Sequence, residues 1–217
     1  MKILCCGDSH TDVFKYCNSR QNKVEFDVCI VGGATAQGVV NPNSNTDALK
    51  VYEKKINSTR ADKILIMLGE VDCGYVIWVR SKRYNISIDD QINISVNNLF
   101  TFINNIIATK NYTNKDIIIC GSVLPTISDS TNKNFLNGAR SEVDVSQLER
   151  TKKTIDYNNL LKNNCYKYGY NYIEITNDIL GKYGIVKDEF LNSNPTDHHL
   201  DNEKTYKLWL SQLLSIL

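Results

Sequence analysis

The sequence lacks the features that would direct a chain to nucleic acid, to a membrane or to an oxidising compartment. Its net charge is only +1, so no strong electrostatic attraction to nucleic acid or acidic membranes is expected. No apolar run is long enough to span a bilayer, and residues 3–6 are too few for the apolar region of a signal peptide. We therefore expect neither nucleic-acid nor membrane partners, whereas the sequence does not indicate the oligomeric state.

The cysteines also argue against a disulfide framework. There are seven, an odd number, and no Cys-x-x-Cys spacing occurs. Cys5, Cys29 and Cys120 lie inside apolar runs, where a free thiol acts as a small hydrophobic side chain. These features favour a reducing setting, and we expect a cytoplasmic protein.

Five short apolar runs alternate with helical patterns along the chain, which at 217 residues is expected to form one domain, residues 1–217. Each run is continuous rather than alternating, as in strands buried on both faces. The predicted strands are residues 3–6, 26–31, 63–68, 117–120 and 172–175. The predicted helices are residues 47–57, 89–110, 148–168 and 203–217. This alternation predicts an α/β fold, a flavodoxin-like three-layer sandwich with a five-stranded parallel sheet.

Polar loops follow the first three predicted strands, and parallel strands place such loops at one edge of the sheet. They are Gly7-Asp8-Ser9, residues 32–38 and Gly69-Glu70-Val71-Asp72. A fourth polar segment, residues 195–200, precedes the last helix. The long polar stretch 124–147 follows the fourth strand and is expected to overhang the same edge.

Histidine is scarce, and its placement points to chemistry. The three histidines, His10, His198 and His199, all lie in these edge segments. Serine hydrolysis needs a nucleophile, a base, a carboxylate that orients the base, and donors for the oxyanion. Ser9 can supply the nucleophile, His199 the base and Asp197 the carboxylate. The N–H groups of Ser9 and Gly33 are the candidate oxyanion donors.

These segments resemble the four sequence blocks of the SGNH (GDSL-like) hydrolases. Gly7-Asp8-Ser9 resembles the first block, Gly32-Gly33-Ala34-Thr35 the second, Gly69-Glu70-Val71-Asp72 the third and Asp197-His198-His199-Leu200 the last. The blocks occur in the family's order and span the chain. The resemblance is nearest to branches that act on acylated polysaccharides, including O-acetyltransferase relatives. It implies the SGNH hydrolase fold and acyl-enzyme chemistry on a small-molecule or glycan acyl ester, with no cofactor.

The sequence departs from the family pattern at two positions. Val71 stands where the family has an asparagine that donates to the oxyanion, and valine cannot donate. His10 is a candidate replacement if its ring faces the pocket. Asp197 precedes His199 by two residues, whereas the family uses three, and Thr196 occupies the family's position. We assign His199 as the base with Asp197 as its support.

The other predicted site residues have supporting roles. Asp8 adjoins the nucleophile, Asp72 is expected to tie loop backbones together, and Arg140 in the overhanging loop is a candidate anchor for an anionic or sugar substrate. Tyr75 and Trp78 could stack on a sugar ring, although core packing is the more common use. A metal site is not expected, because the side chains of Asp197, His198 and His199, adjacent in sequence, would diverge.

Three hypotheses remain open on the sequence. The first is a serine esterase that cleaves a small acyl group, such as acetyl, from a carbohydrate. The second is an O-acyltransferase that passes the same acyl group to a sugar hydroxyl. The third is a non-catalytic glycan-binding relative, in which Ser9 serves only as a helix cap. A phosphate-binding turn at Gly32-Gly33 is disfavoured, because no Gly-x-Gly-x-x-Gly fingerprint is present.

Overall fold

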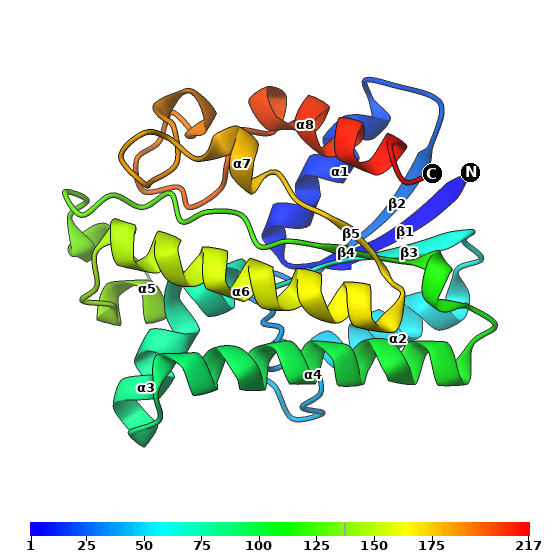
Figure 1. Cartoon of the computed structure of the whole chain (residues 1–217), viewed down its shortest axis with the longest axis horizontal. Coiled ribbons are helices and arrows are strands. Elements are labelled where there is room, and N and C mark those ends of the chain that lie inside the picture. Colours follow the sequence, from blue (N-terminus) through cyan, green and yellow to red (C-terminus); the bar gives the residue numbers. More distant parts are fainter. Residues whose placement is uncertain (137) are drawn as a thin grey trace.

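The computed structural model describes residues 1–136 and 138–217 and is built on a five-stranded parallel sheet (Figure 1). The strand order is β2-β1-β3-β4-β5, which confirms the flavodoxin-like prediction. The strands are β1 (Lys2–Gly7), β2 (Glu25–Ile30), β3 (Lys63–Met67), β4 (Ile117–Cys120) and β5 (Asn171–Ile173). The predicted strands therefore match the observed ones to within two residues at each end.

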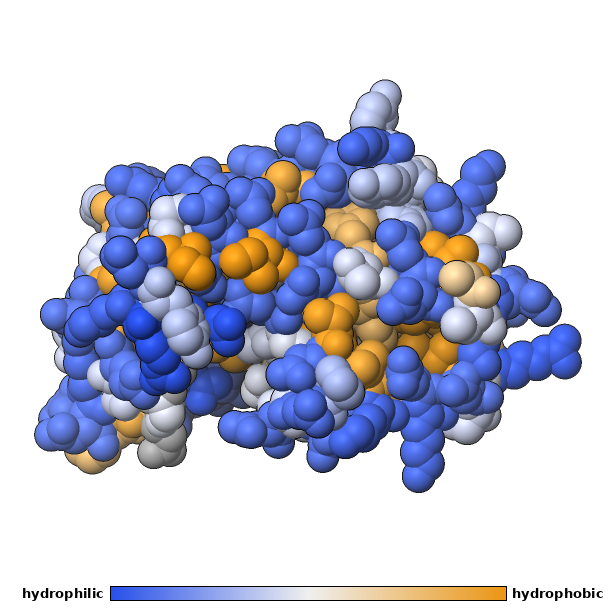
Figure 2. Space-filling view, turned by 90° about the horizontal axis from the view of Figure 1, so that it is seen from below, coloured by the Kyte–Doolittle hydropathy of each residue, from blue (hydrophilic) through white to orange (hydrophobic). Residues whose placement is uncertain are grey.

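Helices cover both faces of the sheet and form the outer layers of the sandwich (Figure 1). One layer contains α2 (Ala48–Ser58), α4 (Ile88–Thr109) and α6 (Gln147–Tyr168), with the shorter α3 (Ile77–Tyr84) and α5 (Ala139–Glu142) at one end. The other contains α1 (Asp12–Asn18), α7 (Thr176–Ile179) and α8 (Asn202–Leu214). Figure 2 shows that the outer surface on the side of α3 and α4 is mainly hydrophilic, with smaller apolar patches between the polar side chains.

The apolar runs of the strands supply two cores, one on each face. Leu4 and Cys6 point into the core beneath α2, α4 and α6, whereas Ile3 and Cys5 point into the core beneath α1 and α8. Successive strand residues face opposite sides, so burial on both faces requires a continuous apolar run. In the described part of the chain all seven cysteines are free, as expected from their positions.

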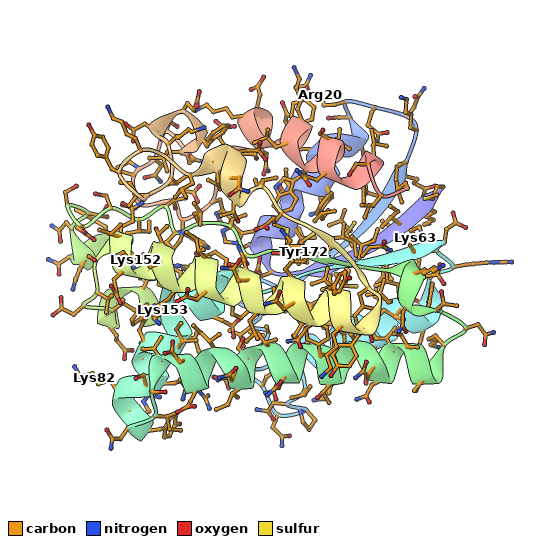
Figure 3. All side chains as sticks on the ribbon, viewed as in Figure 1. Arg20, Lys63, Lys82, Lys152, Lys153 and Tyr172 are labelled. Atoms are coloured by element: carbon orange, nitrogen blue, oxygen red, sulfur yellow. The ribbon has the colours of Figure 1, made fainter. Side chains whose placement is uncertain are left out.

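Two helices next to the predicted site were not predicted. Helix α1 follows the Ser9 turn, and a π-helical turn at Asp72–Val76 leads into α3. On the outer side, Lys153 of α6 extends toward α4 and pairs with Asp89 at 2.7 Å (Figure 3). None of the helices described is both long and apolar enough to traverse a bilayer.

Candidate active site

Ser9 lies at the carboxyl end of β1, at the start of a short 3-10 turn, Ser9–Thr11. Asp8 caps this turn, because its carboxylate accepts the backbone N–H of His10 at 2.9 Å. Gly7 is required before it, since a Cβ there would collide with the Met67 carbonyl and the Thr11 hydroxyl. The strand therefore ends in a tight turn that presents Ser9 at the edge of the sheet.

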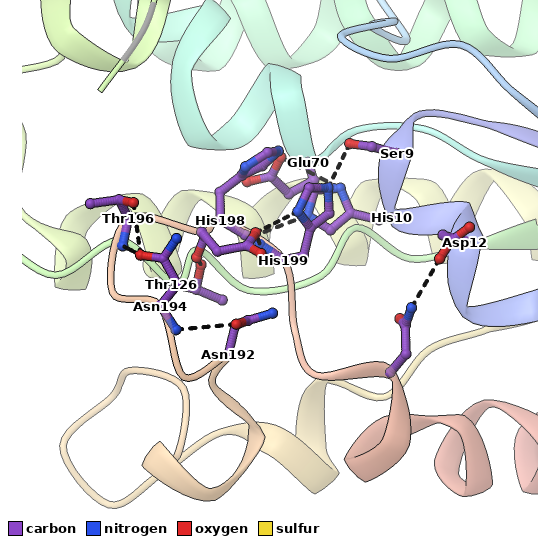
Figure 4. A network of polar contacts seen from close by, with 12 residues as sticks. Ser9, His10, Asp12, Glu70, Thr126, Asn192, Asn194, Thr196, His198 and His199 are labelled. Atoms are coloured by element: carbon purple, nitrogen blue, oxygen red, sulfur yellow. Dashed lines mark hydrogen bonds and ion pairs between the residues drawn. The ribbon is translucent and has the colours of Figure 1, made fainter. Parts of the chain in front are cut away.

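The structure joins Ser9 to His199 and Asp197, although Ser9 and His199 are 190 residues apart in sequence. The Ser9 hydroxyl lies 2.7 Å from Nε2 of His199, and Nδ1 of the same ring lies 2.6 Å from Oδ1 of Asp197 (Figure 4). That oxygen also accepts the backbone N–H of His199 at 2.9 Å. A separation of two residues thus suffices for the carboxylate to reach the ring. The three groups form a serine–imidazole–carboxylate relay within hydrogen-bond reach.

The surroundings of the relay favour a neutral imidazole and an ionised carboxylate. Burial and the nearby positive charge of His10 lower the pKa of His199, and the Asp197 carboxylate offsets only part of this effect. Burial alone would raise the pKa of Asp197, but the hydrogen bonds from His199 hold it below its ordinary value. A neutral ring with its proton on Nδ1 can accept the proton of Ser9 at Nε2.

His10 lies beneath the relay and does not face it with a free donor. Its Nδ1 is 3.1 Å from Asp8 and its Nε2 is 3.2 Å from the backbone carbonyl of His198. Both ring nitrogens are therefore engaged inside the protein, and the suggestion that His10 replaces the family asparagine at the oxyanion is wrong. Burial disfavours the charged ring, but Glu70 and Asp8 prevail and raise the pKa of His10 to about 9.

Glu70 is a buried acid whose importance the sequence did not reveal. Its side chain is 2% exposed, and neither carboxylate oxygen has a hydrogen-bond partner among the described residues. One oxygen lies 3.7 Å from Nδ1 of His10. Burial raises the pKa of Glu70 to about 7, although the positive charge of His10 opposes the shift. Asp8, His10 and Glu70 form a buried charged cluster under the relay.

Asp72 holds the glycine-containing loop that follows β2. Its carboxylate accepts the backbone N–H groups of Ala36 and Gln37, at 2.7 and 2.9 Å, and the Ser95 hydroxyl at 2.7 Å. Asp72 thus links this loop to α4 and is positioned to tie backbones together. Gly33, in the same loop, is exposed and has a φ of 72°, a left-handed conformation that favours glycine.

The position of the family asparagine is filled by an apolar side chain. Val71 is 8% exposed and offers no hydrogen bond to an oxyanion. Among the described residues, the backbone N–H groups of Ser9 and Gly33 have no intramolecular acceptor. These two groups therefore remain available as donors.

Arg140 reaches the site through His198. Its guanidinium lies 2.6 Å from Nε2 of His198, and it covers the ring of Tyr75, with 4.9 Å between the guanidinium carbon and the ring centroid. Arg140, from the stretch 124–147 predicted to overhang the site, therefore lies beside it, while residue 137 of that stretch is outside the described residues. Tyr75 is only 2% exposed, so its ring offers no open face for stacking. Trp78 is half-buried against the core and donates to the Cys73 carbonyl at 2.7 Å.

The three histidines gather their ring nitrogens within 4.8 Å of one another. The expectation that the side chains of His198 and His199 diverge is wrong, because their ring centroids are 3.9 Å apart. Five of the six ring nitrogens have a described partner: His199 bonds Ser9 and Asp197, His10 bonds Asp8 and a carbonyl, and Nε2 of His198 faces the Arg140 guanidinium. A guanidinium at 2.6 Å opposes a second cation, so the group fits a proton relay better than a metal site.

A cavity of about 720 Å³ opens beside the relay, between α1 and the segment that leads into α8. Ser9 and His199 line it together with apolar side chains that include Val13, Met67 and Trp209. Its mouth is polar, with Asp12 and Asn202 joined at 3.2 Å. The cavity can therefore hold a small acyl group on its apolar wall with a polar remainder toward solvent.

Comparison with known proteins identifies the fold. No family model matches the chain, and no curated protein matches it in sequence. Solved structures do match. A protein from Streptococcus pneumonia named for platelet activating factor superposes with a TM-score of 0.67 at 15% identity, covering 99% of this chain and 83% of the other. A lipase/acylhydrolase from Enterococcus faecalis gives 0.59 at 16% identity, with 99% and 93% covered.

An acetyl xylan esterase superposes with a TM-score of 0.57 at 14% identity, with 100% of both chains covered. Further matches include members of the G-D-S-L family of lipolytic proteins. The chain thus has the three-layer fold of the SGNH, or GDSL-like, hydrolases, as its four sequence blocks predicted. At these identities the likeness concerns the fold alone.

Proposed function

We propose that the protein is a serine esterase of the SGNH type that removes a small acyl group, in the first instance acetyl, from a carbohydrate. One observation carries the proposal: the unbroken relay from Ser9 through His199 to Asp197, with contacts of 2.7 and 2.6 Å. Its position at the carboxyl ends of the strands, in a fold shared with solved acylhydrolases, supports the same conclusion.

The reaction follows from the geometry. Nε2 of His199 accepts the Ser9 proton as Oγ attacks the ester carbonyl, and Asp197 stabilises the imidazolium that forms. Collapse of the tetrahedral intermediate expels the alcohol, which takes the proton from His199. Water, deprotonated by the same ring, then attacks the acyl-enzyme and releases the acid. The bond between the acyl carbon and Ser9 Oγ breaks, and His199 returns the water proton to Oγ, which regenerates Ser9.

The oxyanion is held by backbone groups in this proposal. The N–H groups of Ser9 and Gly33 are the donors, and Asp72 fixes the loop that carries Gly33 through its two backbone contacts. With Val71 in place of an asparagine, one side-chain donor is missing, and the loss of one such donor typically costs about 10²–10³ in kcat. We therefore expect a slow esterase on activated esters.

The substrate class rests on the cavity and on a structural neighbour. The cavity of about 720 Å³ has room for a small acyl group and part of a sugar, and one solved neighbour is an acetyl xylan esterase. Labelling with a fluorophosphonate, followed by mass spectrometry, should place the adduct on Ser9. Ser9→Ala and His199→Ala should abolish both labelling and hydrolysis of p-nitrophenyl acetate.

Folded protein that neither labels at Ser9 nor hydrolyses aryl acetates would overturn the proposal. Repeating the assay on acetylated xylo-oligosaccharides tests the substrate class. Adding free sugars distinguishes hydrolysis from acyl transfer, because a transferase would accumulate acylated sugar at the expense of free acetate.

A further inference from the structure

A second cavity, of about 270 Å³, is lined by Arg140, whose guanidinium contacts His198. It is lined by the π-helical turn that carries Tyr75, by α5 with Arg140, by the start of α6 with Arg150, and by residues within 127–136 and 143–146. Two guanidinium groups and a phenol from three separate elements thus converge on one small space.

These groups have hydrogen-bonding capacity that the protein leaves unused. Arg150 is 4% exposed and Tyr75 is 2% exposed. Within residues 1–136 and 138–217, the Nε atoms of Arg140 and Arg150 and the Tyr75 hydroxyl have no hydrogen-bond partner. A buried donor without an acceptor typically costs about 1–3 kcal/mol, more when it is charged. These three buried groups belong to residues that line one cavity, so an acceptor entering it would satisfy them after a local shift of the side chains.

The charge of the cavity points to an anion. Neither Arg140 nor Arg150 forms an ion pair with a described carboxylate; Arg150 instead donates to the Ile127 carbonyl at 2.6 Å. The two acids that line the cavity are already engaged. Asp144 pairs with Lys133 at 2.8 Å, and Asp129 accepts the backbone N–H of Gln147 at 2.6 Å.

The nearest buried acid, Glu70, interacts electrostatically with both guanidiniums and offsets only part of their charge. It lies beside His10, and its pKa of about 7 keeps it only partly ionised at neutral pH. The positive charge of the His10 imidazolium and the two guanidiniums then exceeds the negative charge of Asp8 and Glu70. A net positive charge is left in a poorly solvated region, and a small oxyanion would compensate it.

Arg140 connects this cavity to the relay. Its Nη2 contacts His198 at 2.6 Å, and the ring of His198 stacks beside that of His199 at 3.9 Å between centroids. Figure 4 shows His198 beside His199 and on the side away from Ser9. A group bound by Arg140 would thus sit next to His198, which adjoins the His199 ring of the relay.

We propose that this cavity binds an anionic group of the acylated substrate, a carboxylate or a sulfate ester on a sugar, through Arg140, Arg150 and the Tyr75 hydroxyl. The inference deepens the proposed esterase function and rests on it for the identity of the ester. The preferred substrate is then an acylated acidic saccharide rather than a neutral one. In this role Arg140 and Arg150 are specificity-determining residues.

Binding is measured by titration calorimetry on the Ser9→Ala protein, so that no turnover occurs. The probes are an acetylated methyl galacturonoside, the equally acetylated methyl galactoside 6-sulfate and the neutral acetylated methyl galactoside. The two anionic probes should each bind at least about tenfold more tightly than the neutral one. Comparing them with each other distinguishes a carboxylate from a sulfate source.

The preference should shrink to about twofold or less in Arg140→Gln and fall several-fold in Tyr75→Phe, which removes only the hydroxyl. If Arg150→Gln fails to fold, Arg150→Lys is tested in its place, because lysine keeps the buried positive charge. Arg83→Gln is the matched control, because Arg83 is an exposed arginine of α3 whose only described pairing is with Glu142 at 3.8 Å; it should keep the full preference.

Equal binding of all three probes, or a preference that survives Arg140→Gln combined with Tyr75→Phe, would overturn the inference. The two proposals fail separately. Esterase activity in the wild-type protein without an anionic preference overturns the cavity's role alone. A retained anionic preference in a protein that hydrolyses no ester overturns the proposed function and leaves the binding site standing.

Discussion

The most informative single substitution is Asp197→Asn, because it tests the shortened spacing between the carboxylate and His199. Oδ1 of Asp197 accepts both the ring N–H and the backbone N–H of His199, at 2.6 and 2.9 Å. An asparagine in the same rotamer would present its carbonyl oxygen to both donors. The ring would then keep its tautomer and orientation, and only the negative charge would be lost.

The size of the effect follows from that geometry. A hydrogen bond to a charged group contributes about 1.5–3 kcal/mol and a neutral one about 0.5–1.5 kcal/mol, so losing the charge costs about 1–2 kcal/mol. The Asp197 side chain is 30% exposed, and solvent screening keeps the cost near the lower end of that range. We therefore expect kcat to fall about 5- to 10-fold in Asp197→Asn. Asp197→Ala removes both bonds and should cost about 10³-fold or more.

The assay is steady-state hydrolysis of p-nitrophenyl acetate. The rate measured with the Ser9→Ala protein is subtracted as background. Asp12→Asn serves as the control, because Asp12 lines the same cavity, is half exposed and bonds Asn202 rather than the relay. A kcat within about twofold of wild type for both Asp197 variants would refute the assignment of Asp197. If kcat falls as much in Asp197→Asn as in Asp197→Ala, the hydrogen bonds accepted by Oδ1 do not fix the orientation of the His199 ring.

Three further outcomes are expected. First, kcat/KM should rise with pH through a pKa below 6.5, because burial and His10 lower the pKa of His199 and catalysis needs the neutral ring; an acidic limb above 6.5 would contradict this. Second, Asp72→Ala should lower the free energy of unfolding in urea by about 3–5 kcal/mol, since three buried donors lose their acceptor; a loss under about 1 kcal/mol would argue against that role. Third, burial raises the pKa of Glu70 from 4.5 to about 7, so the folded state binds its proton more tightly than the unfolded chain. Its stabilising contribution is complete below pH 4.5 and is lost as the pH rises to about 7, and Glu70→Gln should flatten the fall of the melting temperature over that window; an unchanged slope would contradict it.

The sheet could be predicted from the sequence because its strands are buried on both faces. Such strands appear as continuous apolar runs, and the helical patterns between them fix parallel connections, as for Ile117–Cys120 between α4 and α6. The short helices α1 and α3 were missed, since seven or eight residues give too few repeats for helical periodicity to stand out. Packing against α8 and α4 stabilises them instead.

The relay could be predicted because Ser9 follows the first strand, and Asp197 and His199 lie in the polar segment just before the last helix, which holds two of the three histidines. The buried groups around it could not. Glu70 appears in the sequence as one acid among many, and its missing hydrogen-bond partners become visible only in three dimensions. Likewise Tyr75, Arg140 and Arg150 come from three elements, and nothing in their spacing indicates that they meet.

The contact between residue 9 and residue 199 has a consequence for inactivation. Helix α8 packs on α1, with Tyr206 beside Tyr16 at 5.3 Å between ring centroids, and the loop that carries His199 leads directly into α8. Segments of this kind can open locally while the rest of a domain stays folded. Detachment of the last helix would withdraw the base from Ser9 and leave the five-stranded sheet intact. On heating, the rate of fluorophosphonate labelling should therefore decline at a lower temperature than the far-ultraviolet circular dichroism of the whole chain.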